Sequence, residues 1–158
     1  MGLDMYLRKR IYIGANYEHN KIGGEINLTK DGVPIKIELN KVTYIIEDCG
    51  YWRKANGIHA WFVENIQEGE DDCKEYYVSA SKLEKLLNIC LQIKANPTLA
   101  PELLPTQDGF FFGNTDYTDY YWEDIDLTIN IINEILSDTV EINGKTFLRG
   151  EIYYQSSW

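Results

Sequence analysis

Gly50-Tyr-Trp-Arg-Lys-Ala-Asn-Gly-Ile-His-Ala-Trp-Phe62 is the stretch on which the fold depends, because the hydrophobic periodicity of the chain changes there. Extended segments precede it, in which apolar and polar side chains alternate as in half-buried strands: residues 3–13, 25–29, 33–39 and 41–47. From Trp52 to Ile66 the apolar positions recur every three or four residues, which predicts a helix. The block therefore indicates a change from a sheet to a first helix.

Two Xaa-Gly pairs predict hairpins on either side of the helical region. Asp31-Gly32 separates two of the extended segments, and Asn143-Gly144 lies between two more near the carboxyl end. Glycine accepts the positive φ that a tight primed turn requires, so both pairs are typical of hairpins. We also expect a last strand at residues 147–154 to pair with the first strand.

Two further helices are expected after the first one. Ser79 and Ser81 are both candidate caps for a helix that Asn96-Pro97 ends. The next helix is predicted from about residue 118 to residue 137. Between the two, a short helical piece is expected at 98–104, and Phe110-Phe-Phe112 predicts a short buried strand or a loop driven into the core.

The order of these elements predicts an α+β fold, in which an antiparallel β-sheet meander packs against about three α-helices. The chain has 158 residues, the usual length of one domain. We therefore expect residues 1–158 to form a single domain with one hydrophobic core.

The net charge limits the partners that the chain can have. Its 15 Lys and Arg residues against 25 Asp and Glu residues give a formal charge of −10. Nucleic acids and anionic membranes are bound through clustered Lys and Arg, so we expect no direct nucleic-acid binding and no membrane association. This charge is compatible with a basic protein partner or a bound cation. It is equally compatible with a role in solubility alone.

The cysteines and the apolar runs indicate a compartment. Cys49, Cys73 and Cys90 form no CxxC pair, and we find no secretion signal. An odd number of cysteines without secretion is typical of reduced thiols in a cytoplasm. No apolar run approaches the roughly 18 residues of a membrane span. We therefore expect a cytoplasmic protein, and we predict no cofactor and no metal.

Few residues are candidates for catalysis. Cys49 lies just before the predicted first helix and His59 lies on it, so they form the better Cys–His pair, because a helix N-terminus lowers a thiol pKa. A carboxylate acting with His59 is another alternative. Neither a Gly-x-Ser-x-Gly elbow nor a glycine-rich phosphate loop is present in the sequence.

The aromatic and basic block supplies the candidate binding residues. Arg53 and Lys54 adjoin two aromatic residues at the predicted helix start, where free backbone N–H groups attract an anion. A ring beside a guanidinium can stack on a base while the guanidinium pairs with a phosphate. Helical projection adds two polar side chains to the stripe of Trp52. The predicted ligand-binding residues are Tyr51, Trp52, Arg53, Lys54, Asn56 and His59. The alternative is that these residues only anchor the helix on the sheet.

Motifs along nearly the whole chain resemble a known family. They are Met1-Gly-Leu-Asp-Met-Tyr-Leu7, Gly50-Tyr-Trp-Arg-Lys-Ala-Asn56, Ile58-His59 with Trp61-Phe-Val63, Leu104-Pro-Thr106, Gly109-Phe-Phe-Phe-Gly113 and Ser156-Ser-Trp158. The sequence resembles a family of small bacteriophage and prophage proteins. The resemblance implies an accessory protein of the bacterial host cytoplasm, and it brings no activity, cofactor or catalytic residue with it. The least similar region, residues 17–40, is interpreted as a lineage-specific loop or hairpin insertion.

Three functional hypotheses follow from the sequence. The first is a non-enzymatic phage-type accessory binding protein, with a role such as counter-defence, that engages a small anionic or nucleotide-like ligand. The second is an acidic protein–protein inhibitor of a host factor, acting through residues 68–72 and 116–126. The third is a hydrolase that uses Cys49 or a carboxylate with His59. The sequence predicts no oligomeric state.

Overall fold

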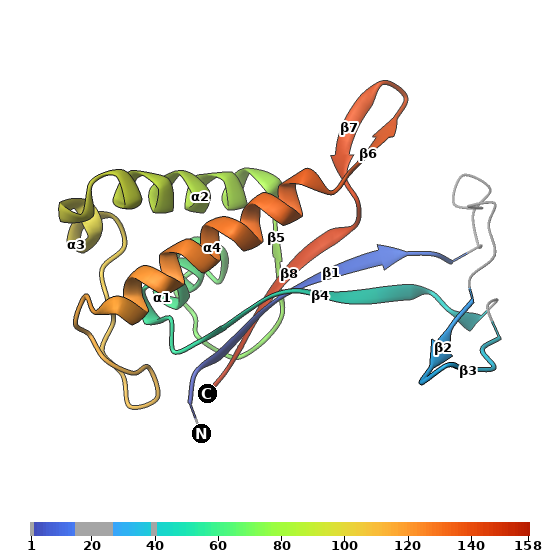
Figure 1. Cartoon of the computed structure of the whole chain (residues 1–158), viewed down its shortest axis with the longest axis horizontal. Helices are drawn as coiled ribbons and strands as arrows, with labels where there is room; N and C mark the ends of the chain where they lie inside the picture. Colours follow the sequence, from blue (N-terminus) through green and yellow to red (C-terminus); the bar gives the residue numbers. More distant parts are fainter. Residues whose placement is uncertain (1, 15–26, 39–40) are drawn as a thin grey trace.

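The main sheet contains four antiparallel strands. The computed structural model describes residues 2–14, 27–38 and 41–158 (Figure 1). Its main-sheet strands are β1 (Asp4–Tyr12), β4 (Tyr44–Arg53), β5 (Tyr76–Val78) and β8 (Glu151–Ser157). Their order is β4-β1-β8-β5. The predicted antiparallel α+β fold is confirmed, but the order is not that of a simple meander, because the last strand lies beside the first at the centre of the sheet.

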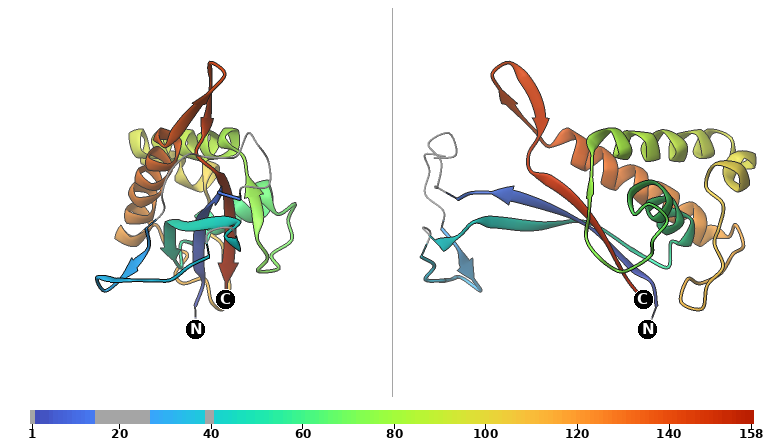
Figure 2. Two further views of the ribbon diagram at one scale, coloured as in Figure 1. Left: turned by 90° about the vertical axis from the view of Figure 1, so that its right-hand side faces the viewer. Right: turned by 180° about the vertical axis from the view of Figure 1, so that it is seen from behind.

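The helices gather on one side of this sheet (Figures 1 and 2). They are α1 (Asn56–Ile66), α2 (Ala80–Ala95), the short α3 (Ala100–Leu103) and α4 (Asp119–Ser137). Alternate side chains of β1, including Met5 and Leu7, are fully buried against them. Every second side chain of β1 and the apolar stripes of the helices, which repeat every 3.6 residues, pack together in one hydrophobic core.

The first helix begins four residues later than the sequence predicts. Strand β4 continues through Tyr51, Trp52 and Arg53, whose side chains are exposed, buried and exposed in turn. Trp52 lies opposite Met5 of β1, so tertiary pairing overrides the local helical periodicity. The strand ends at Lys54, which adopts a left-handed φ of 61° and donates its amide to the carbonyl of Leu3 at 2.8 Å.

Gly50 allows strand β4 to pack closely against helix α4. A Cβ atom at this position would lie only 2.7 Å from Cγ2 of Ile131, a distance that real Cβ contacts do not show. Trp52, which is 1% exposed, then donates its indole N–H to Oγ1 of Thr128 on α4 at 2.9 Å. The glycine and the tryptophan of the block therefore fix the strand to the helix.

The predictions for the later helices are confirmed. Ser79 caps α2 by accepting the amide of Lys82, and the helix ends before Asn96. Cys90 of this helix is fully buried. A 3₁₀ turn (Pro97–Leu99) and α3 occupy the proline-bracketed segment, and α4 follows within one residue of its predicted bounds.

Both predicted hairpins form as small sheets of their own. Strands β2 (Thr29–Lys30) and β3 (Val33–Pro34) make one, and β6 (Thr139–Ile142) and β7 (Lys145–Leu148) make the other. Their turn residues Asp31-Gly32 and Asn143-Gly144 all have positive φ, as primed turns require. Both hairpins extend away from the helices (Figure 2).

Three sequence predictions need comment at this level. Strand β8 pairs with β1 as predicted, but it begins at Glu151, because Phe147 belongs to β7 instead. Of the two alternatives for Phe110-Phe-Phe112, the strand is wrong, since these residues form a turn. Phe112 of this turn packs against the core, whereas Phe110 is 96% exposed. Of the predicted insertion at 17–40, residues 17–26 and 39–40 lie outside the described residues.

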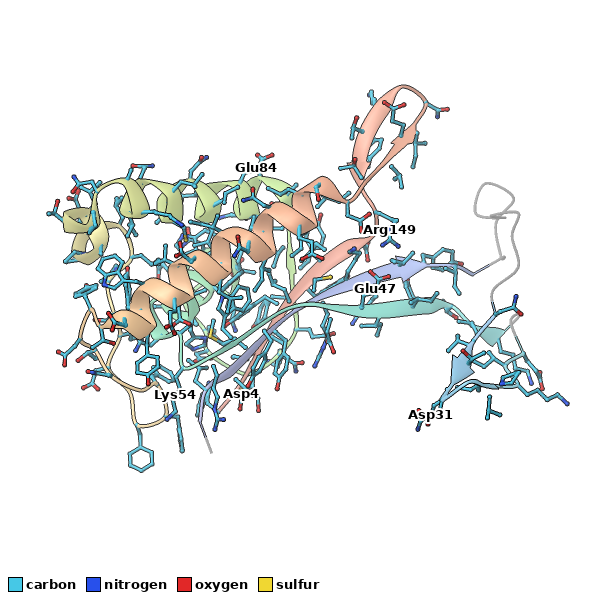
Figure 3. All side chains as sticks on the ribbon, viewed as in Figure 1. Asp4, Asp31, Glu47, Lys54, Glu84 and Arg149 are labelled. Atoms are coloured by element: carbon cyan, nitrogen blue, oxygen red, sulfur yellow. The ribbon has the colours of Figure 1, made fainter. Side chains whose placement is uncertain are left out.

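A charged network joins the sheet to the end of α4 (Figure 3). Lys9 of β1 is only 6% exposed and pairs with Asp138, while its Nζ lies 3.2 Å from Oε2 of Glu47. Arg149 binds the same Asp138 carboxylate at 2.9 Å. The hydrogen bonds from Arg149 and Lys9 lower the pKa of Asp138 to about 2. The ionised form of Asp138 is therefore favoured in the folded state.

Asp138→Asn should lower the free energy of unfolding at pH 7 by about 2 kcal/mol, because a buried cation loses a charged partner. The folded pKa of Asp138 lies below its ordinary value of 3.8, so its contribution is complete above that pH and disappears as the pH falls towards 2. Urea denaturation between pH 3 and 7 measures the difference. Asp126→Asn, which breaks an exposed pair with Lys94, is the control and should cost less than about 0.5 kcal/mol. A constant difference across this range would contradict the account.

Candidate functional site

The structure divides the six predicted ligand-binding residues into two groups. Trp52, Asn56 and His59 are buried and hydrogen-bonded inside the protein. Tyr51, Arg53 and Lys54 are exposed at the end of β4 and the junction with α1. Trp52, Asn56 and His59 therefore do not form one helical stripe. Trp52 and its neighbours Tyr51 and Arg53 belong to strand β4.

Asn56 fastens the loop between α3 and α4 to the start of α1. Its Nδ2 donates to the carbonyls of Phe112 and Asn114 at 3.1 and 2.9 Å, and its Oδ1 accepts the amide of Gln107 at 3.0 Å. These three bonds use the side-chain amide on both sides. Asn56 therefore stabilises this loop, and its side-chain amide is already hydrogen-bonded within the protein.

His59 is fully buried between two polar partners. Its Nδ1 lies 2.7 Å from the Tyr154 hydroxyl, and its Nε2 lies 2.9 Å from Oδ2 of Asp71. Cys49 instead has its thiol 3.6 Å from the carbonyl of Glu47, and burial raises the pKa of that thiol. The structure does not join Cys49 to His59, and a raised pKa is the opposite of what a thiolate nucleophile needs.

The acidic segment 68–72 is partly fixed by hydrogen bonds. Asp71 accepts from the Trp158 indole at 3.1 Å in addition to its contact with His59. Asp72 accepts from the side chains of Lys74 and Tyr76, and the Lys74 contact lowers the pKa of Asp72. Two of the carboxylates predicted for an inhibitory surface therefore have partners within the molecule.

A pocket of about 490 Å³ lies between the start of α1 and the first turns of α4. Arg53 and Lys54 lie on the α1 side, together with the first turn of that helix. Lys54, labelled in Figure 3, marks this junction. The α4 side contributes a ring and three carboxylates: Tyr120, Asp116, Glu123 and Asp124. One wall is thus cationic and the other is acidic.

The first turn of α1 has no capping side chain. Ala55 occupies the N-cap position, and no acidic residue lies in the first turn. The first amides of an α-helix have no acceptor within the helix, and they carry the positive end of its dipole. Gly57 and Ile58 line the pocket at this point, so the positive end of the helix dipole adds to the charges of the two side chains.

Asp124 is the most perturbed carboxyl group of the pocket. Burial raises its pKa to about 7, and the neighbouring Glu123 carboxylate adds to the shift. Among the described residues, no cation or hydrogen-bond donor contributes an opposing effect on that pKa. A bound group that donates a hydrogen bond would supply the partner that Asp124 lacks.

The sequence predicts Asp124 only as part of the acidic surface at 116–126, and not as a residue of this pocket. A signal was nevertheless present. Asp124 lies three and four positions from Tyr121 and Thr128, so helical geometry places it on the buried stripe of α4. A carboxylate on an apolar stripe is unusual and indicates either a partner or a site.

The described part of the chain contains no metal-binding cluster and no helix that could span a membrane. No group of three or more His, Cys, Asp or Glu side chains in residues 2–14, 27–38 and 41–158 is arranged to hold a metal ion. Among the helices of these ranges, none has the length and apolar character that a membrane span needs.

Comparison with protein-family models, curated proteins and solved structures gives no match.

Asn56→Ala should lower the free energy of unfolding by about 3 kcal/mol, because three partly buried hydrogen bonds to the backbone are lost. Hydrogen exchange at the Gln107 amide should accelerate more than the global loss of stability explains. Asn130→Ala, at an exposed position of α4, is the matched control and should change stability by less than about 0.5 kcal/mol. Unchanged protection at Gln107 would show that Asn56 does not hold the loop.

Asp124→Asn should stabilise the protein more at pH 8 than at pH 5. The folded pKa of Asp124 is raised from 3.8 to about 7, so its contribution to stability is greatest below the unfolded value and is lost as the pH rises to 7. Asparagine removes this loss because it carries no charge. Thermal denaturation at the two pH values measures the effect. Asp126→Asn serves as the control, and an equal Asp124→Asn effect at both pH values would contradict the assignment.

Proposed function

We propose that the protein is a non-enzymatic binding protein whose pocket, at the start of α1, takes a small anionic, nucleotide-like ligand. The observation that carries this proposal is the pairing of an uncapped helix N-terminus and two cations with an unpartnered, partly buried carboxyl group across one pocket. A ligand with an anion at one end and donors at the other satisfies both walls.

The cationic wall fits a phosphate or carboxylate group. The Arg53 side chain is 63% exposed, and its Nε lies 4.0 Å from Oδ1 of Asp4, so that pairing leaves the guanidinium accessible. Lys54 carries the second positive charge beside it. Backbone N–H groups of a helix start bind such anions with the help of the helix dipole. Arg is suited to two parallel hydrogen bonds with a phosphate.

The acidic wall excludes a ligand that is anionic throughout. Glu123 and Asp124 would repel a second negative charge, whereas hydroxyl or N–H groups can donate to their carboxylates. A sugar carries such hydroxyl groups, and a base carries such N–H groups. Tyr120 is 78% exposed at the rim and offers a ring on which a base can stack. A nucleoside monophosphate has these features in one molecule.

The resemblance to bacteriophage and prophage proteins supports a role in an infected bacterium. A binding protein without turnover acts there by sequestering its ligand, which is the kind of effect expected of a counter-defence factor. The buried partners of His59 and the raised pKa of Cys49 favour this interpretation over a Cys–His hydrolase. Arg53 and Lys54 are therefore proposed to contact the ligand, and Asn56 to hold the loop between α3 and α4 in place.

Calorimetric titration tests the proposal with adenosine, guanosine, cytidine and uridine 5′-monophosphates and with inorganic phosphate at pH 7.5. At least one nucleotide should bind, and phosphate alone should bind more weakly. Combining Arg53→Gln with Lys54→Gln should weaken binding by at least about tenfold, as expected from the loss of charged hydrogen bonds.

Lys85→Gln is the matched control, because it removes an exposed lysine on α2 that is not among the residues lining the pocket. This variant should bind the nucleotide as the unmodified protein does. No heat of binding for any nucleotide at 5 mM would overturn the proposal. Binding that survives the double substitution would overturn the assignment of the pocket.

A further inference from the structure

The face of the main sheet opposite the helices carries an ordered set of tyrosines and arginines. The strand register places one set of alternate residues on this face: Asp4, Tyr6, Arg8, Arg10 and Tyr12 of β1. Their partners on the neighbouring strands point the same way, because directly paired residues share a face. The helices lie on the other side of the sheet (Figure 2), while Glu75 in the loop before β5 contacts Arg8 and Arg10 on this side. We call this surface the open face.

Six tyrosines lie on the open face, on all four strands: Tyr6, Tyr12, Tyr44, Tyr51, Tyr77 and Tyr153. Three neighbouring pairs are in ring contact, with centroids 5.2 to 6.0 Å apart. Arg8 and Arg10 lie over the rings of Tyr6 and Tyr153 at 4.9 and 4.3 Å. Because these side chains already hold one another in place, a partner would bind them at a small loss of side-chain entropy.

The composition of the open face is that of a protein interface. Tyr and Arg are enriched at the centres of interfaces and among their energetically dominant residues. Three of the four arginines of the chain lie here: Arg8, Arg10 and Arg53. Exposed aliphatic surface adjoins them at Ile46, which is 57% exposed opposite Arg10. A solvated sheet face has no need for this concentration of rings and guanidinium groups.

The charge of the open face suits contact with an identical face. Its arginines are matched by four carboxylates, Asp4, Asp48, Glu75 and Glu151, so the net charge is −1 in a chain of net charge −10. Two copies can therefore meet at this face with little charge repulsion. A two-fold contact uses the same patch on both copies, so it requires mixed charges of both signs, as the open face has.

The dimensions of the open face also suit such a contact. With nine residues in β1 and four strands side by side, it measures roughly 30 by 19 Å, or on the order of 500 Å² in projection. The accessible surface of large side chains exceeds their projected area. The face is therefore comparable with the ≈800 Å² per partner of a stable interface.

We propose that the open face is a homodimer interface, in which two copies of this chain associate about a two-fold axis through their tyrosine and arginine side chains. Single-stranded nucleic acid, which also stacks on aromatic sheets, is not the favoured occupant. Arg8 and Arg10 are already paired with Asp48 and Glu75, and the face as a whole is slightly negative. Phosphate binding requires unpaired positive charge.

Sedimentation velocity from 1 to 200 µM tests the proposal. The unmodified protein should sediment as a dimer at the higher concentrations. Ile46→Glu and Tyr77→Glu each place a carboxylate on the open face, and each should raise the dimer dissociation constant on the order of 30-fold, as for a dominant interface residue. Neither residue lines the pocket at the start of α1, so nucleotide titration reports separately on that site.

Ile142→Glu on β6 is the matched control, because Ile142 is 53% exposed on a strand outside the main sheet. This variant should dimerise as the unmodified protein does. Circular dichroism at the same concentrations checks that all variants are folded. A monomer at 200 µM, or a dimer unaffected by both open-face substitutions, would overturn the proposal. Binding of a fluorescent single-stranded oligonucleotide that Tyr77→Glu abolishes, with a monomeric protein, would assign the face to nucleic acid instead.

Discussion

The pairing of β1 with β4 at Met5 and Trp52 is the constraint on which the rest of the structure depends. It keeps the chain extended through Arg53, turns the Trp52 indole inwards to Thr128 of α4, and leaves the reversal of direction to Lys54. The Lys54 amide then bonds to Leu3, whose own amide donates to the carbonyl of Phe111. The start of β1, the start of α1 and the loop before α4 are therefore held together by a few short contacts.

This junction gives the two sides of the sheet different roles. On the helix side, the first turn of α1 faces α4 across a pocket with one cationic and one acidic wall. On the other side, the alternation of the same strands displays tyrosine and arginine side chains. Arg53 lies at the boundary, because it lines the pocket and belongs to the face that we propose as a dimer interface. The proposed ligand site and the proposed dimer interface are thus adjacent in the molecule, and Arg53 is shared between them.

Much of the fold could be predicted from sequence because local signals and packing agree. The Asp31-Gly32 and Asn143-Gly144 turns, the Ser79 cap and the long apolar stripe of α4 each act over a few residues. The start of α1 could not be predicted, because the spacing of Trp52 relative to Ala55 and Ile58 fits a helix, and only the pairing of β4 with β1 decides otherwise. Of the six predicted ligand-binding residues, Arg53, Lys54 and Asn56 line the pocket. Trp52 and His59 are instead buried and hydrogen-bonded within the protein. Asp124 comes from a segment some 70 residues away, so no local pattern joins it to the block.

The central claim is that the junction of β4 and α1 positions a binding site for an anionic, nucleotide-like ligand. The most direct test is a ¹H–¹⁵N correlation titration with adenosine 5′-monophosphate and the other three nucleoside monophosphates. We expect the largest shifts at the amides of Gly57 and Ile58, with accompanying shifts at Tyr120 and Asp124 across the pocket. Nucleotide-induced shifts confined to other parts of the chain, or none at all at millimolar nucleotide, would contradict the claim.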